Sequence, residues 1–201
     1  MIGSLLGISL VMGQPITLPV VPKESWGLQA KMGKCNPHSI RQITIHHSGT
    51  KIEKNKDVIR HLKSYQRYHL QQGWMDIAYH FIIDLEGNVY QGRSLDCEGD
   101  TFTNYKPNGH LIIMVDGNYE EQSLSTKSWE SLRYLVQWGM QTYQVQEKFI
   151  HPHQALADTL CPGHALMEQL HLHPIAASRQ PIILTYMSIK SAKDFLELIE
   201  Q

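Results

Sequence analysis

The chain has 201 residues, a length that gives one domain a full hydrophobic core and is short for two domains. Its formal net charge of -1 supplies no strong field that would attract nucleic acid or an anionic membrane, so we expect no nucleic-acid partner. The 12 histidines exceed what one metal site uses, and their number alone indicates no function.

The N-terminal segment carries an apolar run at residues 2–12 that has the length of a signal peptide and is too short to span a bilayer. The run predicts export to the periplasm or the extracellular space. A Lys or Arg usually precedes such a run and none does so here, which makes a buried or disordered arm the alternative. We assign residues 1–20 to a signal or N-terminal arm and expect no transmembrane helix elsewhere.

The three cysteines admit two interpretations. If Cys35 and Cys97 form a disulfide, they fit an oxidising compartment and leave Cys161 free for chemistry. Three buried free thiols fit the sequence equally well.

The first half of the chain predicts one strand and one long helix. Residues 18–31 contain proline and are expected to be irregular, with Trp26 as an anchor against the domain. Alternating, β-branched residues predict a strand that starts at Arg41 and ends at His46 or His47. Helical spacing of apolar residues then continues until a glycine stops it. The expected helix has a cap at Asn55 or Asp57, a buried face of Val58, Leu62, Tyr65 and His69, and an end at Gly73.

The second half predicts an antiparallel hairpin, a long loop, a buried strand and further helices. In order, these are strands at residues 78–84 and 88–91, a loop at 92–110, a strand at 111–115, a helix capped by Ser125 or Thr126, a short strand at 149–150 and a helix at 164–172. The result is a single α/β domain with a mixed central sheet flanked by about three helices. We place this domain at residues 21–174, followed by a C-terminal extension at 175–201, in which residues 191–199 can form a short amphipathic helix.

Three residues, His46, His153 and Cys161, have the types that a catalytic zinc site requires: three protein ligands and one position open to water. Alternation along a strand points His46 and His47 to opposite faces, so one of them can bind a metal and the other packs or supports the site. On spacing alone, a polar loop with a buried cysteine is the favoured interpretation of residues 151–161.

Four sequence motifs favour the zinc site over a polar loop with a buried cysteine. They are Ile45-His46-His47-Ser48, then Gly73-Trp74-Met75-Asp76-Ile77-Ala78-Tyr79-His80-Phe81-Ile82-Ile83, then Gly87-Asn88-Val89-Tyr90-Gln91-Gly92-Arg93, then His153 with Asp158-Thr159-Leu160-Cys161-Pro162-Gly163. In this order the motifs resemble the N-acetylmuramoyl-L-alanine amidase family, which includes small phage lysozyme-like amidases and the peptidoglycan recognition proteins. The resemblance covers about residues 23–174.

The resemblance implies one zinc ion per chain, held by His46, His153 and Cys161. It also implies an active-site tyrosine at Tyr79 and a second catalytic residue at Thr159, beside the reacting carbonyl. The implied substrate is peptidoglycan or a muropeptide, and the implied reaction is hydrolysis of the amide between N-acetylmuramic acid and L-alanine. A tyrosine that only packs in a strand remains the alternative for Tyr79.

The sequence departs from the family pattern at positions that bear on the substrate. Ser94 and Leu95 stand where many recognition proteins carry a pair that contacts the stem peptide, so the stem type is open and Leu95 is a candidate substrate-binding residue. Arg93 can pair with a stem-peptide carboxylate, and satisfying loop carbonyls is an equal alternative. Some relatives place a Glu in the strand that here spans residues 111–115. That strand has no carboxylate, which favours a tyrosine-assisted mechanism.

Two functions follow from these observations. The first is an exported zinc amidase. The second is a module that recognises peptidoglycan without cutting it, as family members that lack the cysteine ligand do. Because Cys161 is present, the sequence favours the enzyme.

Overall fold

A seven-stranded sheet lies at the centre of the protein, with strand order β6-β2-β5-β3-β4-β1-β7. The computed structural model describes residues 13–30, 34–53 and 57–199, so the apolar run at residues 2–12 lies outside the described residues. The strands are β1 (Ile16–Val21), β2 (Gln42–His47), β3 (Phe81–Ile83), β4 (Val89–Gln91), β5 (His110–Val115), β6 (Ile150–Pro152) and β7 (Ile182–Tyr186). The helices are α1 (Lys23–Trp26), α2 (Val58–Gln71), α3 (Thr126–Tyr143), α4 (His164–Leu172) and α5 (Ile189–Ile199), with short 3-10 helices η1 (Glu147–Phe149) and η2 (His153–Ala155).

The sheet is mixed, as predicted. β2 lies between β5 and β6 and runs parallel to both, while β3 and β4 form the expected antiparallel hairpin. β5 is buried along its whole length, in agreement with its continuous apolar sequence. β3 begins at Phe81, three residues later than the predicted start at Ala78.

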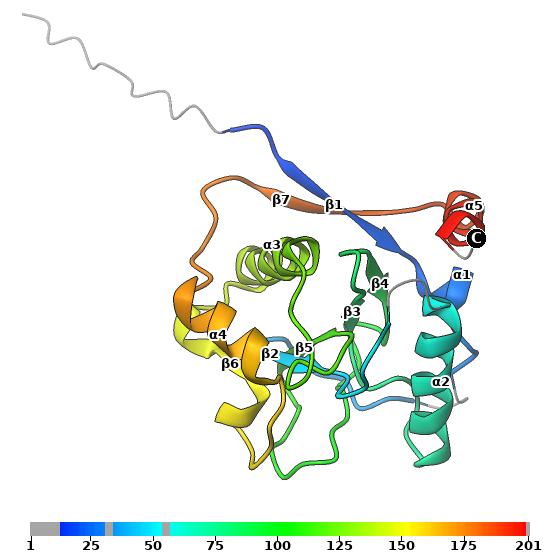
Figure 1. Cartoon of the computed structure of the whole chain (residues 1–201), viewed down its shortest axis with the longest axis horizontal. Coiled ribbons are helices and arrows are strands. Elements are labelled where there is room, and N and C mark those ends of the chain that lie inside the picture. Colours follow the sequence, from blue (N-terminus) through cyan, green and yellow to red (C-terminus); the bar gives the residue numbers. More distant parts are fainter. Residues whose placement is uncertain (1–12, 31–33, 54–56, 200–201) are drawn as a thin grey trace, which may run out of the picture.

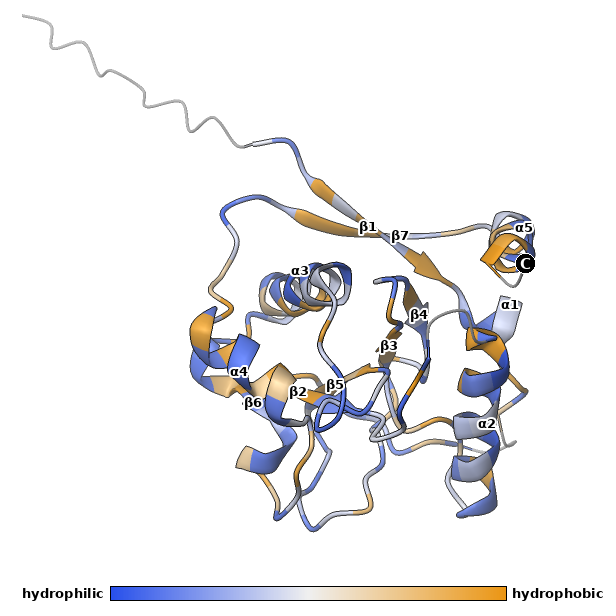
Figure 2. Cartoon of the chain, in the orientation of Figure 1, coloured by the Kyte–Doolittle hydropathy of each residue, from blue (hydrophilic) through white to orange (hydrophobic). Residues whose placement is uncertain are grey.

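Helices cover both faces of the sheet (Figure 1). On one face, Leu135 of α3 belongs to a hydrophobic cluster with Ile43 of β2. On the other face, Leu62 of α2 belongs to a second cluster with Met114 of β5. Coloured by hydropathy, α2 shows hydrophobic and hydrophilic stretches alternating along its length (Figure 2). Because successive side chains of a strand point to opposite faces, Ile43 faces α3 and His46 points to the α2 side of the sheet.

Local sequence signals explain how the two long helices begin and pack. The side chains of Asp57 and Ser125 accept backbone hydrogen bonds at the start of α2 and α3, and both residues are among the predicted caps. A Cβ added at Gly139 would lie 2.8 Å from Cδ2 of Leu111. Glycine at this position therefore lets α3 approach β5 closely.

The buried face of α2 differs in part from the predicted one. It consists of Ile59, Leu62, Gln66 and His69, whereas the predicted face had Val58 and Tyr65 in place of Ile59 and Gln66. Gln66 is buried because its side-chain amide is satisfied: it accepts from the N–H of Leu28 over 2.6 Å and donates to Asp76 over 2.7 Å. A pattern based on hydrophobicity cannot place a hydrogen-bonded amide in the core.

The sequence predicts neither of the two strands at one edge of the sheet. The expectation that residues 18–31 are irregular is wrong for residues 18–21, which belong to β1 and pair in parallel with β4 and β7, and for residues 23–26, which form α1. Trp26 is the expected anchor, since it is 1% exposed and its Nε1–H donates to the carbonyl of Gln91 over 3.0 Å. Residues 175–201 contribute β7 and α5, and α5 includes the expected amphipathic helix.

Five α-helices lie within the described residues, against about three predicted. The three predicted to flank the sheet are α2, α3 and α4, and the others are the four-residue α1 and the C-terminal α5. α1 and α5 contact each other beside the β1–β7 edge (Figure 1). Within the described ranges, no helix is long and apolar enough to cross a membrane.

Candidate metal centre and active site

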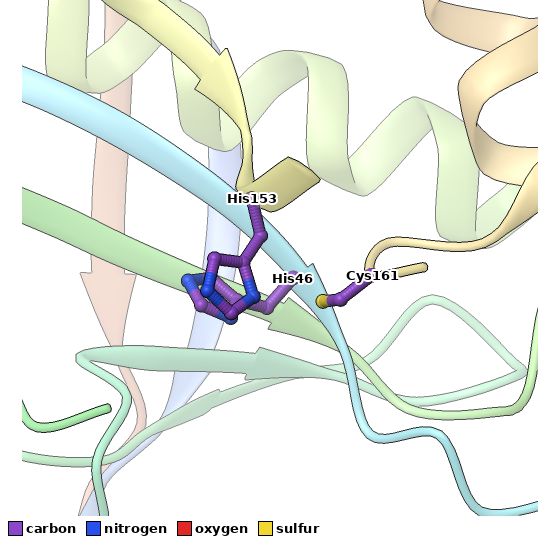
Figure 3. Close-up of side chains that lie close together, drawn as sticks. All are labelled: His46, His153 and Cys161. Carbon is purple, nitrogen blue, oxygen red and sulfur yellow. The ribbon is translucent and has the colours of Figure 1, made fainter. Parts of the chain in front are cut away.

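The three predicted zinc ligands lie together near the ends of β2 and β6 (Figure 3). His46 is the penultimate residue of β2, His153 begins η2 directly after β6, and Cys161 lies in the loop before α4. All three are buried, and their candidate ligand atoms lie within 4.8 Å of one another. The parallel pairing of β2 with β6 brings the two histidines to the same end of the sheet.

The segment from His153 to Cys161 folds back on itself. The N–H of Gln154 donates to the carbonyl of Cys161 over 2.8 Å, which closes the loop. Within the loop, the N–H of Cys161 donates to Oγ1 of Thr159 over 3.2 Å. Sγ of Cys161 in turn accepts from the N–H of His47 over 3.2 Å, so the sulfur is fixed against β2.

His47 points away from the two clustered histidines, as strand alternation predicts. Its Nδ1 accepts a hydrogen bond from the N–H of Tyr119 over 3.3 Å, and its ring stacks on the Tyr119 ring. His47 therefore packs beside the site through its side chain and supports Cys161 through its backbone.

The protonation of the cluster suits a metal ion. Burial, with smaller effects from neighbouring histidines, lowers the pKa of His46 well below its ordinary value, and burial lowers that of His153 to about 4, so both rings are neutral. Burial raises the pKa of Cys161 to about 12, so a cation is needed to hold this group as a thiolate. In the described part of the chain, Nδ1 of His153 is buried with no hydrogen-bond partner. Two neutral imidazoles and one sulfur, with a ring nitrogen left unpaired, fit zinc.

A cavity of about 220 Å³ opens beside these side chains. Tyr79 and Thr159 line it together with His46, His153 and Cys161. A second cavity of about 520 Å³ adjoins it, and both are lined by Trp74, Asp100, Thr101 and Thr103. The two cavities together are large enough to hold more than one residue of an extended ligand.

Tyr79 lies just before β3, not within a strand as the sequence suggests. Its ring centroid is 5.7 Å from that of His46. Burial, together with nearby Cys161, raises the pKa of Tyr79 above its ordinary value, so its hydroxyl keeps its proton and can donate a hydrogen bond into the cavity. Thr159 is half-buried and lines the same cavity, and its hydroxyl oxygen accepts from the N–H of Cys161.

Arg93 and Leu95 have contacts inside the protein. The Arg93 guanidinium donates to the carbonyl oxygens of Ile77, Glu98 and Asp76 and also pairs with the carboxylate of Asp100. Four of the roughly five N–H groups of an arginine are thus engaged. Leu95 is partly buried and packs against the core cluster on the α3 side of the sheet.

The long loop between β4 and β5 is anchored at several points. Cys97 forms a disulfide with Cys35, with a Cα–Cα distance of 5.5 Å, and Cys161 is the free cysteine. Nε2 of His80 lies 2.9 Å from the carbonyl oxygen of Cys97, while Nδ1 of His80 accepts from the N–H of Ile112 over 2.9 Å. The loop is therefore tied both to the sheet and to the segment before β2.

Two residues of this loop reach the histidine cluster, and sequence reasoning does not identify them. The hydroxyl of Thr103 lies 2.7 Å from Nε2 of His153, and the hydroxyl of Tyr105 lies 3.2 Å from Nε2 of His46. The sequence identifies residues 92–110 as a long loop, and such loops often carry binding groups. It contains no periodicity that could say which side chains turn inward.

Comparison with known proteins places the chain in a family. The model of the N-acetylmuramoyl-L-alanine amidase family matches residues 36–164, and the chain belongs to this family, as the sequence motifs predict. The chain is similar to peptidoglycan-recognition protein SC2 of Drosophila simulans, with 29% identity over 155 residues that cover 75% of this chain and 84% of the relative.

Solved structures of peptidoglycan recognition proteins have a similar fold. The crystal structure of Drosophila peptidoglycan recognition protein SD matches with a TM-score of 0.66 and 25% identity, covering 81% of this chain and 98% of the other. The structure of peptidoglycan recognition protein LE in complex with tracheal cytotoxin, a monomeric diaminopimelic acid-type peptidoglycan, matches with a TM-score of 0.68 and 25% identity. That match covers 77% of this chain and 94% of the other.

Proposed function

We propose that this protein is an exported, zinc-dependent N-acetylmuramoyl-L-alanine amidase that cleaves the amide between N-acetylmuramic acid and the L-alanine of the peptidoglycan stem. The observation that carries the proposal is the buried group of His46, His153 and Cys161 at a cavity lined by Tyr79 and Thr159. Membership of the amidase family and a relative solved with a peptidoglycan fragment support the same reaction and substrate class.

The three ligands would hold one zinc ion per chain. When bound, zinc polarises the amide carbonyl and makes water a stronger nucleophile near neutral pH. Tyr79 has a separate role, because its protonated hydroxyl donates a hydrogen bond to the oxygen on which negative charge develops. Thr159 lies on the same cavity wall as Cys161 and can donate a second hydrogen bond to that oxygen.

The arrangement of carboxylates supports a tyrosine-assisted reaction. Asp100 lines the cavity, but its carboxylate is paired with the guanidinium of Arg93. Asp116 follows β5 and is buried, but it lines a different cavity. Tyr79 is therefore the side chain that we assign to orient water or stabilise the oxyanion.

The second candidate function is recognition of peptidoglycan without cleavage. The named relatives are recognition proteins, and the two adjoining cavities could bind a muropeptide in either case. The Cys35–Cys97 disulfide supports an oxidising location outside the cytoplasm for both functions.

Product analysis on purified peptidoglycan separates the two functions. Zinc-loaded protein is incubated with sacculi of the diaminopimelate type and of the lysine type, and released peptides are identified by mass spectrometry. An amidase releases stem peptides that begin with a free L-alanine amine, and a chelator abolishes the release. If the protein binds sacculi but releases peptide from neither type, it is a recognition protein and not an amidase.

A further inference from the structure

We infer that Thr103 and Tyr105 are positioning residues for the zinc site: their hydroxyls hold the Nε2 edges of His153 and His46, so that Nδ1 of each ring is the metal-binding atom. This inference rests on the zinc site proposed above. It adds two residues from the loop between β4 and β5 to a centre whose ligands come from other segments.

The contacts of His153 carry the first half of the argument. A neutral imidazole has one N–H donor and one nitrogen with a free lone pair. Nε2 of His153 lies 2.7 Å from the Thr103 hydroxyl, whereas Nδ1 is buried and, among the described residues, has no hydrogen-bond partner. An N–H on Nε2 that donates to Thr103 leaves the lone pair on Nδ1. A buried lone pair without a donor is costly, and a metal ion removes that cost.

Tyr105 makes the corresponding contact with His46. Its hydroxyl lies 3.2 Å from Nε2 of His46, so Nδ1 lies on the side of the ring away from Tyr105. The Tyr105 ring also lies edge-on to the His153 ring, at a centroid distance of 5.2 Å. The ring centroids of His46 and His153 lie 4.1 Å apart. Tyr105 therefore contacts both rings and helps to fix the placement of each.

The loop is built to hold these hydroxyls still. The hydroxyl of Thr103 lies 2.9 Å from Oγ1 of Thr101, which also accepts from the N–H of Thr103 over 3.1 Å. Just before these residues, Asp100 pairs with buried Arg93, and Cys97 is tied by its disulfide. The Thr103 hydroxyl can therefore accept a hydrogen bond from Nε2–H of His153 and donate one to Oγ1 of Thr101. Fixed partners of this kind set the tautomer and orientation of metal-binding histidines.

Metal binding through Nε2 predicts a different result. If Nε2 were the metal-binding atom of each ring, the hydroxyls of Thr103 and Tyr105 would occupy the space of the metal and would have to leave when it binds. Removing the hydroxyls would then tighten zinc binding or leave it unchanged.

Zinc affinity of the folded protein tests the inference without reference to activity. We would measure the zinc dissociation constant by chelator competition for wild type, Thr103→Val and Tyr105→Phe. Each variant should bind zinc about 10- to 100-fold more weakly. Thr103→Ser restores a hydroxyl and should recover most of the affinity. Tyr134→Phe and Thr185→Val, which make the same changes on α3 and β7, should bind like wild type.

Circular dichroism and the absorption of the cobalt-substituted proteins provide a second measurement. Variants with native circular dichroism and an intact cobalt–thiolate band, but weakened metal affinity, would support a positioning role. Unchanged or tighter zinc binding in both hydroxyl-deleted variants would overturn the inference while leaving the proposed amidase intact. A wild-type protein that binds no zinc would overturn both.

Discussion

The backbone N–H of His47 donates a hydrogen bond to Sγ of Cys161 over 3.2 Å and so joins two segments that lie 114 residues apart in the chain. The residue next to the candidate ligand His46 thus fixes the sulfur of Cys161, the third candidate ligand. A sulfur that accepts an N–H bond is also more easily held as a thiolate. The end of β2 therefore positions two of the three candidate ligands at once.

Replacement of the sulfur should weaken metal binding sharply. In Cys161→Ser the N–H of His47 keeps an acceptor, but a hydroxyl is a poor substitute for a thiolate at zinc. We expect the purified variant to contain well under one zinc per chain, whereas the wild type contains one. Metal analysis after dialysis measures this, and full zinc retention by the variant would remove Cys161 from the site.

Loss of the Tyr79 hydroxyl should affect the reaction and spare the fold. Tyr79→Phe keeps the ring that packs 5.7 Å from His46, so zinc content should be unchanged. Because the lost hydrogen bond is stronger in the transition state than in the ground state, turnover should fall by at least about tenfold, with little change in muropeptide affinity. Steady-state peptide release and binding are measured in parallel, with Tyr134→Phe as the matched control. Weaker binding at unchanged turnover would instead make Tyr79 a binding residue.

The disulfide should contribute substantially to stability. Cys35 and Cys97 are separated by 62 positions, and closing a loop of that length contributes roughly 4 kcal/mol in the chain-entropy model. The double variant Cys35→Ser/Cys97→Ser should lose about that much free energy of unfolding in urea. Thiol titration of the denatured, unreduced wild type is the simpler check: it should find only Cys161 reactive, and three reactive thiols would show that no bridge forms.

His80 should make stability depend on pH in the acidic range. Burial lowers its pKa to about 3 in the folded protein, with backbone Cys97 opposing the shift, while an unfolded histidine titrates near its ordinary value of 6.5. Between these values the unfolded chain binds the extra proton. The contribution of neutral His80 is therefore fully present above about pH 6.5 and is lost as the pH falls.

Urea unfolding at several pH values isolates this effect. Between about pH 6 and pH 3, His80 should add a slope of about 1.4 kcal/mol per pH unit to the free energy of unfolding. His80→Gln keeps a hydrogen-bond donor but does not titrate, so its curve should be less steep by that amount and lower at neutral pH. His171→Gln, an exposed change on α4, should retain the wild-type slope. Equal slopes for wild type and His80→Gln would contradict a neutral, buried His80.

Sequence reasoning succeeded where a short-range rule determines the structure. Strand alternation separates His46 from His47 because the side-chain period of a strand is two. Asp57 and Ser125 could be named as helix caps because the N-terminal N–H groups of a helix need acceptors. The family motifs placed His46, His153 and Cys161 in one group, and the structure brings their ligand atoms together.

The remaining features depend on partners that are distant in sequence. Pro19 obscures β1 in the sequence, because proline is disfavoured in strands. In the sheet, Pro19 is paired with Thr185 of β7, while β4 pairs with Val20 and Val21. Gln66 is buried because Leu28 and Asp76 satisfy its amide. Tyr105 reaches His46 from a loop without periodicity. In each case the deciding contact joins residues that a local window does not contain.

Because β1 pairs with β7, β1 can complete its pairing in the sheet only after residues 182–186 have been synthesised. β1 is made early, but one of its neighbours, residues 182–186, emerges more than 160 positions later in synthesis or translocation. Until then, β1 presents an open row of backbone N–H and C=O groups to other chains. The family-matched segment, residues 36–164, contains neither strand, so the histidines and cysteine of the site can gather before this edge closes. A nascent chain whose three candidate ligands have already come together is thus still open to mispairing along β1, until β7 pairs with that strand.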